Sequence, residues 1–234
     1  MKRLIAGLFV LLLALPAWGD GFSPRQTVAT NLLLRSQEFD NASWTKSAGS
    51  ISANAVAAPD LTTTADQFIE DTAGGTSHGL IQAATITAGA TVTGSLYVKA
   101  NGRTAVYIQI YDGSADWFAG WFNLTTGAYS GEHVGGGGDL TGQSIEALAD
   151  DWYRISVTGT LGAGDTTAEM RPGVSAGYNA GDVGASFNYT GDGASGLYLW
   201  GAMLNEGALS SYVVTTTATV TRAEPAHIGG DGFR

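Results

Sequence analysis

The chain has 234 residues, a formal net charge of −10 and no cysteine. An acidic chain without a basic cluster repels nucleic-acid phosphates, so we exclude nucleic acid as a partner, and the lack of cysteine excludes a disulfide framework. Glycine is abundant, with 34 residues, and proline is scarce, with five. This composition is typical of a β protein with many tight turns, and the length is enough for one large domain.

The N-terminus has the pattern of a secretory signal peptide. The basic pair Lys2–Arg3 precedes the apolar run Leu4–Leu15, and Ala17 and Gly19 form a small-residue cleavage site. The apolar run is shorter than the ~20 residues that a membrane-spanning helix needs. We therefore predict that residues 1–19 are removed, that the mature chain is secreted to the periplasm or the extracellular space, and that it does not associate with a membrane.

After residue 30, short runs of alternating apolar and polar residues are separated by Gly, Thr, Asp and Asn. This pattern predicts strands at 49–56, 64–71, 79–87, 91–100, 103–112, 117–125, 128–134, 143–149, 152–161, 168–176 and 196–204. Helical periodicity is almost absent after the signal segment, so we predict an all-β fold, a two-sheet antiparallel jelly-roll sandwich. We expect residues 20–30 to be a lead-in segment, residues 31–224 to form the sandwich domain and residues 225–234 to be a flexible tail.

The last predicted strand is apolar on both faces. Strict alternation places Leu197, Leu199, Gly201 and Met203 on one face and Tyr198, Trp200, Ala202 and Leu204 on the other. We interpret this segment as the closing strand of the sandwich, with Trp200 in a structural position.

Motifs that resemble catalytic signatures lie in the wrong context. The G-x-S-x-G match at 75–79 and the G-x-G-x-x-G match at 191–196 both precede strands, whereas the functional motifs open helices. The three histidines are scattered singly, and most aspartates lie in turns rich in Gly and Asn. We therefore predict no catalytic residue and a chain that is not an enzyme. A glycoside hydrolase or lyase built on paired carboxylates is the least favoured alternative.

Aromatic residues with polar neighbours suggest a ligand face. Tyr107, Gln109 and Tyr111 share one face of a predicted strand, and Trp117 and Trp121 belong to the next strand. Sugars stack their C–H faces on aromatic rings and use amides for their hydroxyls, so we predict a carbohydrate-binding site at these five residues. The alternative is that the rings pack against each other within the fold.

Several stretches together resemble a known family. These are 31–46, 95–104, 150–160 and 196–224. They look like parts of the jelly-roll domains of phage tail, head-fibre and other virion proteins, which are distant relatives of carbohydrate-binding modules with a galactose-binding-like sandwich. The resemblance covers nearly the whole chain after the signal segment.

This resemblance implies a non-catalytic role in binding or virion structure. Related modules often hold a structural Ca²⁺ between the first and last strands, and the matching positions here are Glu38 and Glu206. We therefore expect a secreted, non-catalytic module that binds a carbohydrate or cell-surface glycan. The alternative is a structural or adhesive protein of a virion or cell surface, as a homo-oligomer or within a virion assembly.

Overall fold

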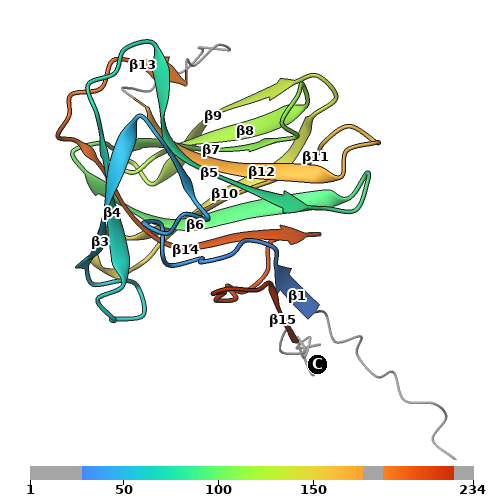
Figure 1. The fold of residues 1–234 in the computed structure, drawn as a ribbon, viewed down its shortest axis with the longest axis horizontal. Coiled ribbons are helices and arrows are strands. Elements are labelled where there is room, and N and C mark those ends of the chain that lie inside the picture. The colour runs from blue at the N-terminus through green and yellow to red at the C-terminus, as the bar shows by residue number, and fades with distance from the viewer. Residues whose placement is uncertain (1–27, 176–186, 224–234) are drawn as a thin grey trace, which may run out of the picture.

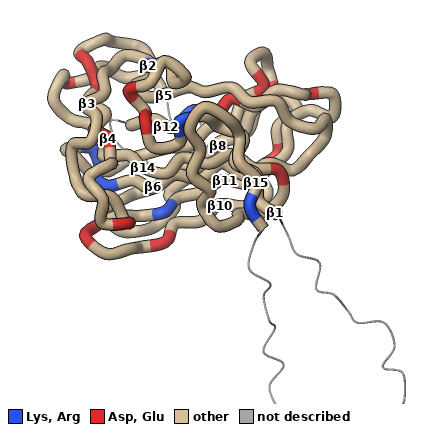
Figure 2. Tube along the Cα trace, turned by 60° about the horizontal axis from the view of Figure 1, so that its bottom comes forward, with Lys and Arg blue, Asp and Glu red and all other residues tan. Residues whose placement is uncertain are grey.

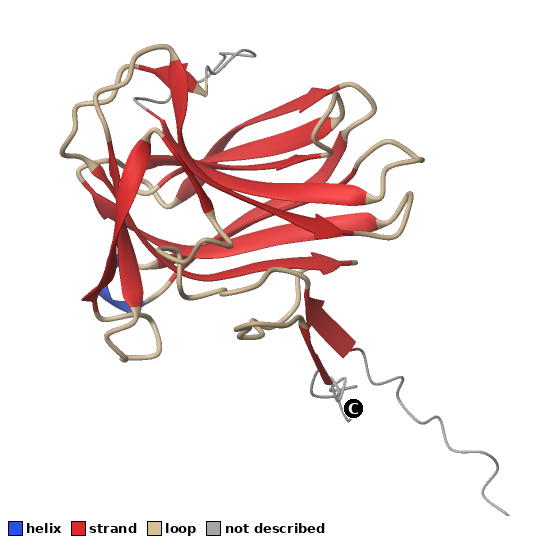
Figure 3. Ribbon diagram, in the orientation of Figure 1, coloured by secondary structure: helices blue, strands red, loops and turns tan. Residues whose placement is uncertain are grey.

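The computed structural model describes residues 28–175 and 187–223, and its regular structure is almost entirely β-strand (Figure 3). Within these residues the one helical element is a short 3-10 turn, η1 (Ala149–Asp151). The predicted all-β class is therefore confirmed. The predicted signal peptide and the predicted tail lie outside the described residues. In the described part of the chain, no helix is long and apolar enough to cross a membrane.

Every predicted strand is present. They are β3 (Gly49–Val56), β4 (Ala65–Glu70), β5 (Thr76–Thr85), β6 (Thr91–Asn101), β7 (Ala105–Tyr111), β8 (Trp117–Asn123), β9 (Ala128–Gly135), β10 (Asp139–Ala147), β11 (Tyr153–Thr160), β12 (Thr167–Ser175) and β14 (Gly196–Glu206). The alternation pattern misses four short strands, β1 (Val28–Asn31), β2 (Thr45–Ser47), β13 (Asn188–Tyr189) and β15 (Val220–Ala223). Runs of two to four residues are too short for a period of two to be recognised.

Most strands form two facing antiparallel sheets, and β1 pairs with β15 in a separate two-stranded sheet (Figure 1). The six-stranded sheet has the order β10-β11-β6-β14-β4-β3. The seven-stranded sheet has the order β13-β5-β12-β7-β8-β9, and β2 pairs with β5 beside this path. The predicted two-sheet sandwich with a jelly-roll-like arrangement is therefore confirmed.

The main hydrophobic core lies between the two sheets. The seven-stranded sheet contributes Val106, Ile108, Ile110, Phe118 and Phe122, and the six-stranded sheet contributes Leu96, Val98, Ile155, Val157, Leu197 and Leu199. All of these side chains are buried. Alternate residues of each strand point into this layer, so the period of two in the sequence corresponds to the inner faces of the sheets.

A β-bulge interrupts β14. Trp200 pairs with Tyr97, but Met203 pairs with Ser95, so β14 has one residue more than β6 in this stretch. Gly201 lies inside the bulge with a φ of 61°, in the left-handed region that favours glycine. The extra residue reverses which side chains face the core.

The strict alternation predicted for 196–204 is therefore wrong after the bulge. Leu197 and Leu199 lie in the main core, as one face of the prediction requires. Beyond the bulge Ala202 and Leu204 join them there, whereas Met203 lies in a separate cluster. One inserted residue exchanges the two faces because successive side chains of a strand point to opposite sides.

Trp200 lies on the outer face of the six-stranded sheet in a small buried cluster with Trp152. Its ring centroid is 5.1 Å from that of Tyr97, and its indole Nε1 donates a hydrogen bond to Thr64 Oγ1 at 3.0 Å. A buried ring with a satisfied N–H agrees with the structural position expected for Trp200.

Asn31 connects the start of the domain to its closing strand. The side chain is fully buried, and its Nδ2 donates to the carbonyl oxygens of Ala202 and Val213, at 3.0 and 2.8 Å. Its Oδ1 accepts hydrogen bonds from the N–H groups of Leu33 and Leu204, at 3.1 and 3.3 Å. β1 pairs with β15, so the end of the segment expected to be a lead-in is part of the folded structure.

Figure 2 shows acidic positions around the loops at the ends of the strands and few basic positions between them. This agrees with the net charge of −10. A basic side chain that lines a surface groove is therefore unusual in this protein.

Candidate functional site

The predicted ligand-binding residues lie on the outer face of the seven-stranded sheet, opposite the core. The pairing of β7 with its neighbours arranges them in three rows across the strands. The first row is Gly173, Tyr107 and Trp121, the second is Arg171, Gln109, Ala119 and His133, and the third is Glu169, Tyr111, Trp117 and Gly135. A polar row therefore lies between two aromatic rows.

Two glycines allow the aromatic rings to lie flat on neighbouring strands. A Cβ atom at Gly173 would overlap the ring of Tyr107, and a Cβ atom at Gly135 would overlap the indole of Trp117. Gly173 is directly opposite Tyr107 on the neighbouring strand, and Gly135 is directly opposite Trp117. The close approach of ring to backbone requires a residue without a side chain at each place.

A groove of about 340 Å³ opens on this face. Its lining includes Tyr107, Gln109, Tyr111, Trp117, Arg171 and Phe187. Four of the five predicted ligand-binding residues thus line one groove. Tyr111 and Trp117 are partly exposed, whereas Tyr107 and Gln109 form its more buried wall. Its volume is in the range of small-molecule sites.

Trp121, the fifth predicted residue, does not line the groove. It is 2% exposed, and Phe187 stacks on it with ring centroids 5.0 Å apart. Phe187 also contacts Tyr107 at 4.8 Å. We therefore correct its assignment from a ligand contact to the floor beneath Phe187, because a ring covered by another ring cannot stack on a sugar.

Arg171 is held in place by two neighbours. Its Nε and Nη2 both donate to Glu169 Oε2, the first at 2.8 Å, and its guanidinium carbon lies 4.2 Å from the ring centroid of Tyr111. Burial raises the pKa of Tyr107, and the nearby Arg171 charge and a hydrogen bond with Ser77 offset part of that rise. Tyr107 is therefore a neutral hydroxyl at physiological pH.

Sequence reasoning missed Arg171 and Phe187. Alternation within 168–176 does place Glu169 and Arg171 on one face, opposite Met170. It does not show that Arg171 lies beside Gln109, because this depends on the register of β12 against β7. His133 lies with its ring centroid 4.7 Å from that of Trp117 at the edge of the same face.

The two predicted calcium ligands have separate partners. Glu38 forms an ion pair with Arg35 at 2.8 Å, and Glu206 accepts hydrogen bonds from Thr87. Backbone hydrogen bonds join Leu32 to Leu204 and Ser36 to Ala202.

These contacts show that segment 32–36 runs antiparallel to β14. Glu38 therefore lies beyond one end of the paired stretch, and Glu206 lies beyond the other. On β14, Glu206 lies four residues beyond Ala202, the partner of Ser36, which is about 13 Å at about 3.3 Å per residue and longer than the ~5 Å between two ligands of one calcium ion. The structure therefore does not form the expected site at this pair.

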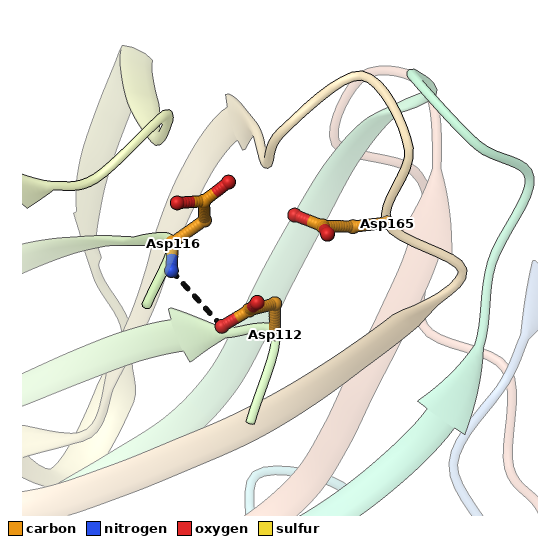
Figure 4. Close-up of side chains that lie close together, drawn as sticks. All are labelled: Asp112, Asp116 and Asp165. Atoms are coloured by element: carbon orange, nitrogen blue, oxygen red, sulfur yellow. Dashed lines mark hydrogen bonds between the residues drawn. The ribbon is translucent and has the colours of Figure 1, made fainter. Parts of the chain in front are cut away.

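A different group of carboxylates lies where two loops meet (Figure 4). One carboxylate oxygen from each of Asp112, Asp116 and Asp165 lies within 4.8 Å of the others. Oδ1 of Asp112 accepts the backbone N–H groups of Ser114 and Asp116, at 2.8 and 3.0 Å. Desolvation and the two neighbouring carboxylates raise the pKa of Asp165. These contacts are those of a turn, and we assign no function to the group.

A buried ionic network ties β4 to the loops beside β13 and β14. The carboxylate of Glu70 accepts hydrogen bonds from the guanidinium of Arg103, the hydroxyl of Tyr189 and the backbone N–H of Asp192, the last at 2.8 Å. Arg103 also lies 3.4 Å from the Asp192 carboxylate. Each charge is paired, as buried ionic groups require, so this network is structural.

Comparisons with known proteins place few limits on function. No protein-family model matches the chain, and a search of curated proteins finds no match. Among solved structures, the fold is similar to the enzymatically active domain of tailspike protein 4 from bacteriophage CBA120, with a TM-score of 0.42 and 11% identity. The match covers 76% of this chain and 21% of that chain, so this protein corresponds to about a fifth of the tailspike chain.

One prediction is corrected by this comparison. The chain was expected not to be an enzyme, but the matched tailspike domain is described as enzymatically active. We therefore no longer hold that the protein lacks catalysis. A likeness with a TM-score below 0.5 transfers neither activity nor substrate to this chain.

Proposed function

We propose that the groove on the outer face of the seven-stranded sheet binds a glycan. The observation that supports this most directly is the pair of partly exposed rings, Tyr111 and Trp117, directly opposite each other on β7 and β8. Gln109 and Arg171 line the same groove beside them. A sugar ring presents C–H groups to aromatic faces and hydroxyls to amide and guanidinium groups, and this groove offers both kinds of contact.

The rings and the polar groups have separate roles in this proposal. Tyr111 and Trp117 stack on one sugar residue, because directly paired side chains in an antiparallel sheet have Cβ atoms about 5 Å apart. Gln109 supplies one acceptor and two donors to hydroxyl groups. Phe187, which stacks on the buried Trp121, closes one side of the groove, so a bound sugar loses water from more of its surface.

Export is part of the same proposal. The N-terminal pattern of a basic pair, a short apolar run and a small-residue cleavage site supports secretion of the mature chain. A secreted protein meets polysaccharides and cell-surface glycans, which are the ligands that the groove suits.

The test is a glycan array probed with the purified chain, followed by calorimetric titration of the best-bound oligosaccharide. We expect Trp117→Ala and Tyr111→Ala each to weaken binding about fivefold, the equivalent of about 1 kcal/mol for one stacked ring. The matched control is Tyr129→Ala, because Tyr129 is an aromatic residue of β9 that is 59% exposed and does not line the groove. Circular dichroism of each variant confirms folding.

An array without any bound glycan would overturn the proposal. So would unchanged affinity in both groove variants, since binding would then take place elsewhere on the protein.

A further inference from the structure

We infer that the bound glycan is acidic and that Arg171 and Gln109 hold the carboxylate of a uronic acid residue. This inference rests on the proposed function. Among the described residues that line the groove, Arg171 is the only charged side chain. The chain has 11 Lys and Arg residues against 21 Asp and Glu residues, so an arginine as the only charged side chain among the described lining residues stands out.

Arg171 and Gln109 lie side by side. They are directly paired across β12 and β7 and therefore point to the same face, with Cβ atoms about 5 Å apart. A guanidinium has a planar fork of donors that matches the two oxygens of a carboxylate, and the amide of Gln109 adds two more N–H donors. Together they suit a planar anion better than a hydroxyl group.

The contacts of Arg171 orient its guanidinium without using all of its donors. Nε and Nη2 bind Glu169, and the ring of Tyr111 supports the guanidinium from one side. Nη1 donates no hydrogen bond to a residue in the described part of the chain. An arginine has five N–H groups, so donors remain for a ligand after Glu169 is bound.

Glu169 provides a second test of the inference, in which a substitution is expected to strengthen the binding of an acidic glycan. Its carboxylate neutralises Arg171 in the free protein and repels a carboxylate that approaches the same guanidinium. Glu169 is not among the described residues that line the groove, and Glu169→Gln removes its charge but keeps an oxygen that can accept from Arg171. The uncharged variant Glu169→Gln should therefore bind an acidic glycan more tightly than the parent chain and a neutral glycan equally well.

The experiment compares acidic oligosaccharides with neutral copies of themselves. The probes are hexamers of galacturonate, mannuronate and guluronate and a hyaluronan hexasaccharide, each also prepared with its carboxylates reduced to primary alcohols. We expect the parent chain to bind at least one acidic probe ten times more tightly than its reduced form. Arg171→Gln should remove this preference, and Glu169→Gln should increase it. Arg222→Gln, at an exposed arginine outside the groove, is the control.

The outcomes separate this inference from the proposed function. Equal binding of acidic and reduced probes, or an acidic preference that survives Arg171→Gln, overturns the inference and leaves glycan binding intact. A chain that binds no acidic or reduced probe and no glycan on the array overturns both. If Arg171→Gln does not fold, Glu169→Gln still decides, because unchanged or weaker binding of the acidic probe contradicts the role of Arg171.

Discussion

Trp121 decides whether the aromatic face is a packed floor or an open platform. In the structure its ring is covered by Phe187 and contacts Tyr107, with ring centroids 5.0 and 5.9 Å away. Burial of a tryptophan removes about 200 Å² from water, which at about 25 cal/mol per Å² is about 5 kcal/mol. This agrees with the ~3–5 kcal/mol that truncation of a buried Trp to Ala costs.

Trp121→Ala should therefore lower the free energy of unfolding by about 3–5 kcal/mol. For a domain of this size, 1 kcal/mol corresponds to about 2–4 °C in Tm, so the variant should melt about 6–20 °C below the parent chain. The measurement is thermal unfolding by calorimetry, with urea unfolding as an independent value. Trp117→Ala, at a partly exposed ring of the same strand, should cost clearly less.

A second variant separates packing from polarity. The indole Nε1 of Trp121 is buried and has no hydrogen-bond partner among the described residues. Trp121→Phe keeps most of the ring and removes this unsatisfied donor, so we expect stability within about 1 kcal/mol of the parent, with glycan binding retained. If Trp121→Ala melts within 2 °C of the parent, the ring is not buried as described and our reasoning about this face is refuted.

Three further predictions concern other parts of the chain. Asn31→Ala leaves two buried carbonyls and two buried N–H groups without partners and should cost about 3 kcal/mol in urea unfolding; a loss below about 0.5 kcal/mol would contradict the role of Asn31. Hydrogen bonds from the Ser195 backbone N–H, the Ser195 hydroxyl and the Ala194 N–H lower the pKa of Asp192 in the folded chain. The ionised Asp192 carboxylate therefore stabilises the fold fully above its ordinary pKa near 4, and this stabilisation is lost as the pH falls below that value. We expect the Tm difference between the parent chain and Asp192→Asn to be constant above pH 5 and to be smaller at pH 2.5. A difference that stays constant over this range would count against the assignment. N-terminal sequencing of the exported protein should begin at Asp20, give or take a few residues, and recovery of Met1 would exclude cleavage.

Much of the candidate site could be predicted because it depends on one strand at a time. Tyr107, Gln109 and Tyr111 alternate with three aliphatic residues of β7, so the sequence alone determines that they share a face. The same local rule predicted every long strand and the sandwich class. It could not predict Arg171, which lies 62 positions from Gln109 in the sequence and reaches it only through the register of β12 against β7.

What the tertiary structure decided involves residues far apart in the chain. The register of β12 against β7 places Arg171 beside Gln109 in the groove. Phe187 covers Trp121, so Trp121 is a buried ring and not a surface for stacking. The antiparallel direction of segment 32–36 places Glu38 and Glu206 at opposite ends of its contact with β14. The bulge at Gly201 shows the same limit within one strand, because the extra residue is defined only against the partner β6. The period of two is a property of the local backbone, whereas register, cover and bulges depend on hydrogen bonds and packing between distant segments.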